Sequence, residues 1–129
     1  MSDTPLSGIR VLDFTWMIAG TMATRPLANL GAQVIKVESR ARVDGMRMGN
    51  IRVGDPTNPD ASVVFNDCNT SKLGMTIDLG RPEGIALVKQ LVAISDVVVN
   101  NFSGTRMERW GLDYEALRAI KPEIVMMQM

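Results

Sequence analysis

Arginine and aromatic side chains are the residues of this sequence whose types and placement point most directly to a ligand. Arginines stand in segments that follow apolar runs, at Arg40, Arg42, Arg81 and Arg109, and Phe102 follows another such run. A guanidinium offers forked donors to phosphate oxygens, and an aromatic ring can lie against a purine or a thioester arm. Loop arginines are more often solvated than bound, so each alone is weak evidence. Their shared placement predicts a ligand with several phosphates and a flat ring.

The carboxylates and the only cysteine indicate less specific chemistry. Asp13 ends the first apolar run, a position that favours a structural role over a catalytic one. Glu38 ends the second run, where a dinucleotide-binding enzyme would bind ribose, although it could equally pair with Arg40 or Arg42. Cys68 is expected to be a packed thiol, because the sequence has no histidine to activate it. The lack of histidine also argues against histidine-based triads and the usual zinc sites, and we expect no metal.

The two common phosphate-binding loops have no counterpart in the sequence. The first apolar run continues as D-F-T-W-M-I-A-G over residues 13–20, which is not the G-x-G-x-x-G turn of a dinucleotide-binding enzyme. No glycine-rich loop ends in the lysine of a nucleotide triphosphatase. The sequence therefore disfavours an ordinary nicotinamide-dependent enzyme.

Length and composition fit one domain that spans residues 1–129. Apolar residues make up 46% and charged residues 22% of the chain, which is enough for a packed core. The 14 basic residues balance the 14 acidic residues, which argues against a nucleic-acid partner. Residues 1–8 lack the features of a signal peptide, and no run approaches the roughly 18 apolar residues of a membrane span. We expect a soluble, cytoplasmic protein.

The elements that must position these side chains alternate along the chain. Short branched runs predict strands, and apolar residues at helical spacing predict helices. The expected strands are 9–14, 33–38, 75–79, 96–100 and 124–128, and the expected helices are 19–30, 82–95 and 114–121. Pro26 should kink or shorten the first helix. This order predicts an α/β fold with a Rossmann-like open parallel sheet.

Two further features complete the predicted architecture. A stretch without periodicity at about 39–72 is expected to be a long functional or mobile loop. The second helix should bury one apolar stripe, formed by Ile85, Leu87, Val88, Leu91, Val92 and Ile94. Because ligands of parallel sheets bind beyond the carboxyl ends of the strands, the segments after the strands should together form the binding edge.

Several stretches of the chain together resemble the opening of the class III CoA-transferases, the CaiB/BaiF type. That family includes formyl-CoA and carnitine CoA-transferases and alpha-methylacyl-CoA racemases. The matching stretches occur in family order at residues 6–15, 19–20, 30–38, 69–72, 75–79, 82–84, 96–102 and 111–117. The resemblance covers essentially the whole chain and implies an N-terminal portion of the family's large domain.

The resemblance implies coenzyme A or an acyl-CoA as the bound substrate. It places Met17 and Ile18 at the thioester and Ser39 and Arg40 near the adenine. The positions expected along the nucleotide, its phosphates and the pantetheine arm are Ile77, Leu79, Arg81, Asn101, Phe102 and Arg109. The sequence departs from the family pattern at Asn100, where a glutamate is usual, and at Gly80, where some members have a lysine. Phosphate binding is thus expected to rely on Arg81.

The family resemblance also implies a mechanism. In the transferases an aspartate attacks the thioester and forms mixed-anhydride and enzyme–CoA thioester intermediates. In the racemases it acts with a histidine in proton transfer. That aspartate lies beyond residue 129, so we expect no catalytic residue here, no acyl transfer by this chain alone, and an interlocked homodimer for the full-length protein. A segment of a racemase-type isomerase, a non-catalytic CoA- or partner-binding module, and a truncated product are the alternatives.

Overall fold

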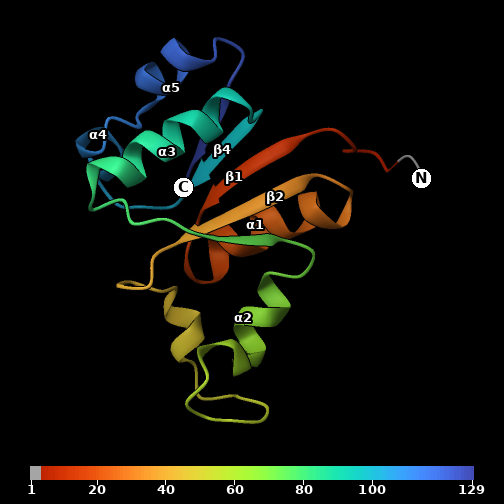
Figure 1. The fold of residues 1–129 in the computed structure, drawn as a ribbon. Coiled ribbons are helices and arrows are strands. Elements are labelled where there is room, and N and C mark those ends of the chain that lie inside the picture. The colour runs from red at the N-terminus through yellow and green to blue at the C-terminus, as the bar shows by residue number, and fades with distance from the viewer. Residues whose placement is uncertain (1–3) are drawn as a thin grey trace.

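Five short parallel strands form one sheet in the computed structural model, which describes residues 4–129 (Figure 1). The strands run in the order β3-β2-β1-β4-β5, and every neighbouring pair is parallel. Their bounds are β1 Arg10–Phe14, β2 Gln33–Glu38, β3 Leu73–Thr76, β4 Val97–Asn100 and β5 Val125–Gln128. This is the order of a doubly wound sheet, in which the chain reverses its direction of travel between β1 and β4. The predicted Rossmann-like α/β fold is confirmed.

Helices cover both faces of the sheet. The α-helices are α1 Met17–Asn29, α2 Val63–Cys68, α3 Pro82–Ala93, α4 Arg106–Arg109 and α5 Tyr114–Ile120. Two short 3-10 helices, η1 Gly45–Met48 and η2 Pro59–Ala61, precede α2. Figure 1 shows α3 and α5 on one side of the sheet and α1 on the other. Within residues 4–129 no helix has the length and apolar character needed to cross a bilayer.

Alternation along the central strands divides the core into two layers. In β1, Leu12 and Phe14 pack into the larger cluster, which includes Val88 and Val92 of α3. The intervening Val11 faces the opposite way and packs with Ala28 of α1. Successive strand side chains point to opposite faces, so a strand covered on both sides must be apolar almost throughout.

Helix α1 differs from its predicted form at its start. It begins at Met17 rather than at residue 19 and continues through Pro26 to Asn29, so the expected shortening is wrong. Proline removes the hydrogen bond to the carbonyl four residues earlier, which belongs to Met22. Met22 is 41% exposed and Pro26 is also exposed, so water can satisfy that carbonyl.

Strand β3 lies earlier than the predicted 75–79. It pairs with β2 from Ile35 opposite Leu73 to Glu38 opposite Thr76, and Ile77 donates one further backbone hydrogen bond to Glu38. Because β2 ends at Glu38, residues 78 and 79 have no strand beside them to pair with. The predicted strand was therefore displaced toward the C-terminus.

The stripe predicted for α3 is too wide. Val88 and Val92 are fully buried, whereas Leu87 is 43% and Ile94 57% exposed. Each helical residue advances by about 100°, so Leu87 and Ile94 share a flank turned away from the face of Val88. These two side chains lie outside the core clusters formed by the described residues.

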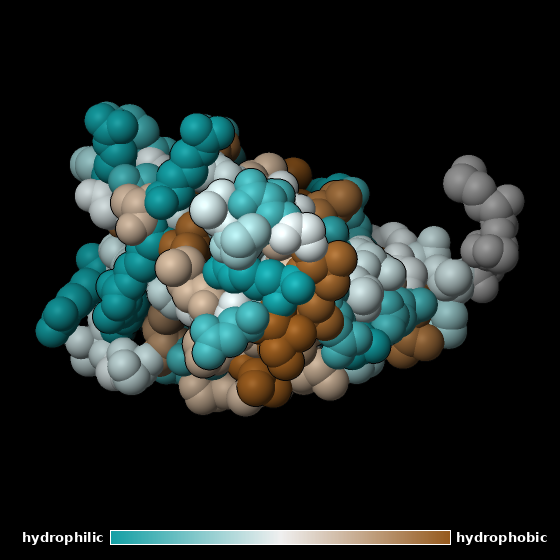
Figure 2. Space-filling view, turned by 90° about the horizontal axis from the view of Figure 1, so that it is seen from below, coloured by the Kyte–Doolittle hydropathy of each residue, from teal (hydrophilic) through white to brown (hydrophobic). Residues whose placement is uncertain are grey.

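The segment 39–72 is more ordered than the predicted loop, because it contains η1, η2 and α2. Met46, Phe65 and Cys68 form a small buried cluster of their own, which confirms Cys68 as a packed thiol. The outer side of the segment exposes Met48, Ile51 and Val53, each at 64% or more. Figure 2 views the molecule from that side and shows hydrophobic patches between hydrophilic ones.

Candidate functional site

A cavity of about 230 Å³ lies at the carboxyl ends of the strands. Its walls come from the last residues of β1 and β2 and from the segments that follow β2, β3 and β4. The lining side chains include Trp16, Glu38, Ser39, Arg42, Ile77, Asp78, Leu79, Phe102, Arg106 and Trp110. The position agrees with the rule that open α/β sheets bind ligands beyond the carboxyl edge, next to the point where strand order reverses.

Aromatic rings form one wall of the cavity. The ring of Phe102 lies between those of Trp16 and Trp110, with centroid distances of 5.7 and 5.4 Å and interplanar angles of 74° and 81°. Edge-to-face contacts at these distances are favourable for aromatic pairs. The guanidinium of Arg42 lies 5.6 Å from the Trp16 ring, and that of Arg106 lies 5.5 Å from the Phe102 ring. A flat apolar wall with cations on it can hold a ring and an anionic group together.

Glu38, at the end of β2, is bound within the protein. Its carboxylate accepts two hydrogen bonds from Arg47, at 2.9 Å from both Nε and Nη2, and one from the backbone N–H of Asp44 at 3.1 Å. Arg47 also contacts Asp60 and stacks 3.6 Å from the ring of Phe65. Burial acts to lower the pKa of Arg47, but the hydrogen bond and charge of Glu38, helped by Asp60, raise it above its ordinary value.

The expected partners of Glu38 were thus wrong. The ion pair is formed with Arg47, not with Arg40 or Arg42. A carboxylate held by a bidentate guanidinium has few lone pairs left for a ribose hydroxyl. Glu38 instead fixes η1, which contains Arg47, against the end of β2.

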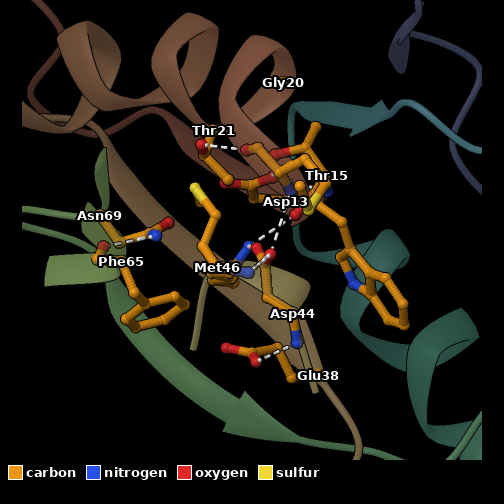
Figure 3. Close-up of polar contacts among 12 residues, drawn as sticks. Asp13, Thr15, Gly20, Thr21, Glu38, Asp44, Met46, Phe65 and Asn69 are labelled. Atoms are coloured by element: carbon orange, nitrogen blue, oxygen red, sulfur yellow. Dashed lines mark hydrogen bonds and ion pairs between the residues drawn. The ribbon is translucent and has the colours of Figure 1, made fainter. Parts of the chain in front are cut away.

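Asp13 is a buried structural carboxylate (Figure 3). One of its oxygens accepts hydrogen bonds from the backbone N–H of Thr15, at 2.8 Å, and from the Thr15 hydroxyl. The other accepts from Thr24 at 2.6 Å and from the ammonium group of Lys72 at 2.9 Å. Burial lowers the pKa of Lys72, and the charge of Asp13 opposes that change. The structural role predicted for Asp13 is confirmed.

The turn of residues 15–17, which joins β1 to α1, is held by side chains from other elements. Asn101 brackets Trp16: its amide oxygen accepts from the Trp16 N–H at 2.8 Å, and its amide nitrogen donates to the Trp16 carbonyl at 2.7 Å. Asp44 accepts from the Met17 N–H at 3.0 Å and forms a buried ion pair with Lys36 at 2.9 Å. Lys36 in turn donates to the Thr15 carbonyl.

This network maintains an unusual backbone. Met17 has a φ of 59°, a left-handed conformation that is rare for residues other than glycine. Gly20 then passes so close to Thr15 that an added Cβ would lie 2.4 Å from the Thr15 Cβ. Strained backbone persists where surrounding contacts determine it, and such places are frequently functional.

The structure brings part of the predicted site together. Ser39, Ile77, Leu79 and Phe102 line the cavity. Arg40 and Arg81 line two neighbouring hollows, one beside Asp60 and the other beside Glu83. Met17 and Ile18 are 53% and 57% exposed at the start of α1. Asn101 holds Trp16, and Arg109 is exposed on α4 outside the cavity wall. Ligand contacts of all these residues stay predictions.

Several residues of the cavity wall were not singled out from the sequence, notably Trp16, Arg106 and Trp110. Phe102, Arg106 and Trp110 are spaced by four residues, a spacing that would place side chains on one side of a helix. That spacing was the available signal, but the four-residue helix α4 within it was not predicted. Asn100 is fully buried at the end of β4.

Comparisons with known proteins agree with this fold. The family model described as CoA-transferase family III matches residues 6–129. A succinate–glutarate CoA-transferase of Agrobacterium fabrum is 40% identical over 124 residues, which are 94% of this chain and 31% of that protein. The succinyl-CoA–L-malate CoA-transferase alpha subunit of Chloroflexus aurantiacus is 39% identical over 125 residues, 96% of this chain and 28% of that subunit.

A solved structure also resembles this chain in sequence and in fold. The crystal structure of a CAIB/BAIF family protein from Brucella suis superposes with a TM-score of 0.88 at 36% identity, and the match covers 98% of this chain and 33% of that one. The chain spans about a third of the length of the relatives it matches. Since the family match extends over nearly all of its residues, the chain belongs to CoA-transferase family III.

Proposed function

We propose that this chain forms the coenzyme A-binding part of an enzyme that moves CoA between carboxylic acids. The observation that carries the proposal is the cavity at the carboxyl edge, whose wall combines Trp16, Phe102 and Trp110 with the guanidiniums of Arg42 and Arg106. An adenine nucleotide offers a flat ring for such a wall and phosphates for the cations.

The size of the cavity suits one end of the ligand. Its 230 Å³ is below the roughly 300–1,000 Å³ of a site that encloses a whole small molecule. We infer that it holds the adenosine end, in contact with Ser39, Ile77 and Leu79. The pantetheine arm would then run along the sheet edge toward Met17 and Ile18, which are exposed at the start of α1.

The relatives favour a transferase over a racemase. The matched proteins are named for succinate, glutarate and L-malate CoA transfer. We propose by analogy that the parent enzyme of this chain transfers CoA between dicarboxylic acids. No observation among the described residues favours a racemase or a non-catalytic module.

The covalent step is assigned to a carboxylate outside residues 4–129. In the proposed reaction an aspartate oxygen attacks the thioester carbonyl, the C–S bond breaks, and the CoA thiolate leaves. The thiolate then attacks the aspartyl carbonyl of the anhydride and expels the donor acid as its carboxylate. Asp13 is unsuited to this role, because it is fully buried and paired with Lys72. Asp44 is likewise buried and paired with Lys36.

A homodimer and a cytoplasmic location stay predictions. The exposed hydrophobic side chains of the segment 39–72, among them Met48, Ile51 and Val53, support a partner surface there.

Isothermal titration calorimetry with CoA tests the proposal. The chain, shown to be folded by circular dichroism, is expected to give saturable heat with CoA and none with pantetheine alone. Absence of heat at CoA concentrations on the order of millimolar would refute CoA binding. A separate assay with succinyl-CoA and glutarate should detect no transfer by this chain, and measurable turnover would contradict the assignment of the covalent step to a residue elsewhere.

A further inference from the structure

Two guanidiniums on the cavity wall are held by aromatic rings. Arg106 lies 5.5 Å from the centre of the Phe102 ring and 5.9 Å from that of Trp110, and Arg42 lies 5.6 Å from that of Trp16. Across residues 4–129, neither arginine forms an ion pair with an aspartate or glutamate. A guanidinium over an aromatic face is attracted by the ring and keeps its N–H donors available for an anion.

The carboxylates beside these cations have other partners. Glu38 is held by Arg47 and by the backbone of Asp44. The Oδ1 of Asp78 accepts the Gly80 N–H at 2.9 Å. The positive charges of Arg42 and Arg106 are therefore not neutralised by a direct contact on the cavity wall, and a bound anion could neutralise them.

Other arginines near this edge are placed differently. Arg47 is committed to Glu38 and Asp60. Arg81, the residue on which phosphate binding was expected to rely, lines a separate hollow. Arg109 follows Arg106 by three residues on α4 but is not part of the cavity wall. Arg42 and Arg106 differ from these arginines because they lie beside the aromatic wall of the cavity.

We propose that Arg42 and Arg106 bind the phosphates of the nucleotide, with Arg42 at the ribose phosphate and Arg106 at the diphosphate. This rests on the proposed CoA-binding function. Arg42 follows the end of β2, the side on which doubly wound folds bind ribose and on which an arginine can accommodate a ribose phosphate. Arg106 follows β4, on the other side of the point where strand order reverses. Ligands of doubly wound folds cross the crevice at that point, so a diphosphate that extends from the ribose toward β4 would meet Arg106.

Calorimetry with CoA and with dephospho-CoA, which lacks the ribose phosphate, tests both assignments. Arg106→Gln is expected to weaken both ligands about tenfold or more, because it removes a charge-assisted contact to the diphosphate. Arg42→Gln should weaken CoA to a similar extent and leave dephospho-CoA unchanged. The control is Arg118→Gln on the exposed side of α5, which removes the same charge away from the cavity and should bind like the unaltered chain.

The outcomes separate this proposal from the proposed function. If the unaltered chain binds no CoA, the proposed function fails. If it binds CoA but Arg106→Gln binds equally well, or if Arg42→Gln weakens both ligands equally, the phosphate assignment fails. A loss with Arg109→Gln and none with Arg106→Gln would overturn it in favour of Arg109. Should Arg106→Gln not fold, Arg106→Lys retains the charge but not the forked donors, and CoA affinity equal to that of the unaltered chain would refute a contact made through the Arg106 guanidinium.

Discussion

The ammonium group of Lys72 lies 2.9 Å from Oδ2 of Asp13, and both side chains are buried. The two residues are separated by 59 positions along the chain. Lys72 also donates to the Thr21 carbonyl and to the Asn69 side chain. One ion pair thus joins β1, α1 and the end of the segment 39–72, directly beneath the turn that leads to the candidate site.

Lys72→Met is expected to lower the free energy of unfolding by about 3–5 kcal/mol, because it leaves the Asp13 carboxylate buried without its counter-charge. Urea denaturation followed by circular dichroism measures the change. In a double-mutant cycle, Asp13→Asn combined with Lys72→Met should cost less than the sum of the single changes. Additive costs would show that the two groups do not stabilise each other.

Asp96 is expected to make stability depend on acidic pH. Its carboxylate accepts from the Arg10 backbone N–H at 2.8 Å and from Lys121 at 2.9 Å. These contacts, the backbone hydrogen bond first, lower its pKa below the ordinary 3.8. The unfolded chain then binds more protons than the folded chain in this range, so stability rises with pH across it.

The resulting prediction compares the chain with Asp96→Asn. The stabilisation from Asp96 should be fully present above pH 3.8 and should disappear as the pH falls through the lower pKa of the folded state. Urea denaturation at neutral and at acidic pH measures the gap between the two proteins. A gap of constant size would contradict the prediction, and Lys121→Met should reduce it.

Gly20→Ala is expected to destabilise the chain by about 1–3 kcal/mol, the usual cost of overpacking. The new methyl group would lie 2.4 Å from the Thr15 Cβ and 3.1 Å from the side-chain carbon of Asn101, so the turn that holds Trp16 must move. Gly74→Ala in β3 is the control, because a Cβ there meets no atom within 4 Å. Thermal unfolding of both variants checks the difference, and equal melting temperatures would refute the close approach.

Features fixed by local pattern could be predicted from the sequence. Strand β2 matches its predicted bounds of Gln33 to Glu38, because a run of branched residues between a turn and a polar segment strongly favours a strand. The alternation of strands and helices was then sufficient to predict a parallel sheet with a binding edge. Ser39, Ile77 and Phe102 were placed at that edge by the family resemblance, and they do line the cavity.

Features fixed by tertiary contact could not be predicted. The bounds of β3 depend on where its neighbour β2 ends, and the partner of Glu38 depends on how η1 folds back to bring Arg47 within reach. The contact between Arg42 and Trp16 joins the segment that follows β2 to the segment that follows β1. Composition and periodicity carry no information about such pairings, so the arginines of the sequence looked equivalent until the fold separated them.

Tryptophan fluorescence should report ligand binding directly. The chain has 2 tryptophans, Trp16 and Trp110, and both line the cavity. A nucleotide placed against this wall must change the surroundings of both indoles, including the buried Trp16 Nε1, which has no hydrogen-bond partner among the described residues. CoA is therefore expected to change the emission of the unaltered chain, and Trp16→Phe and Trp110→Phe should each retain part of that change. If calorimetry shows binding while the emission stays constant, CoA binds elsewhere on the chain, because no ligand could occupy this cavity without contacting the ring wall.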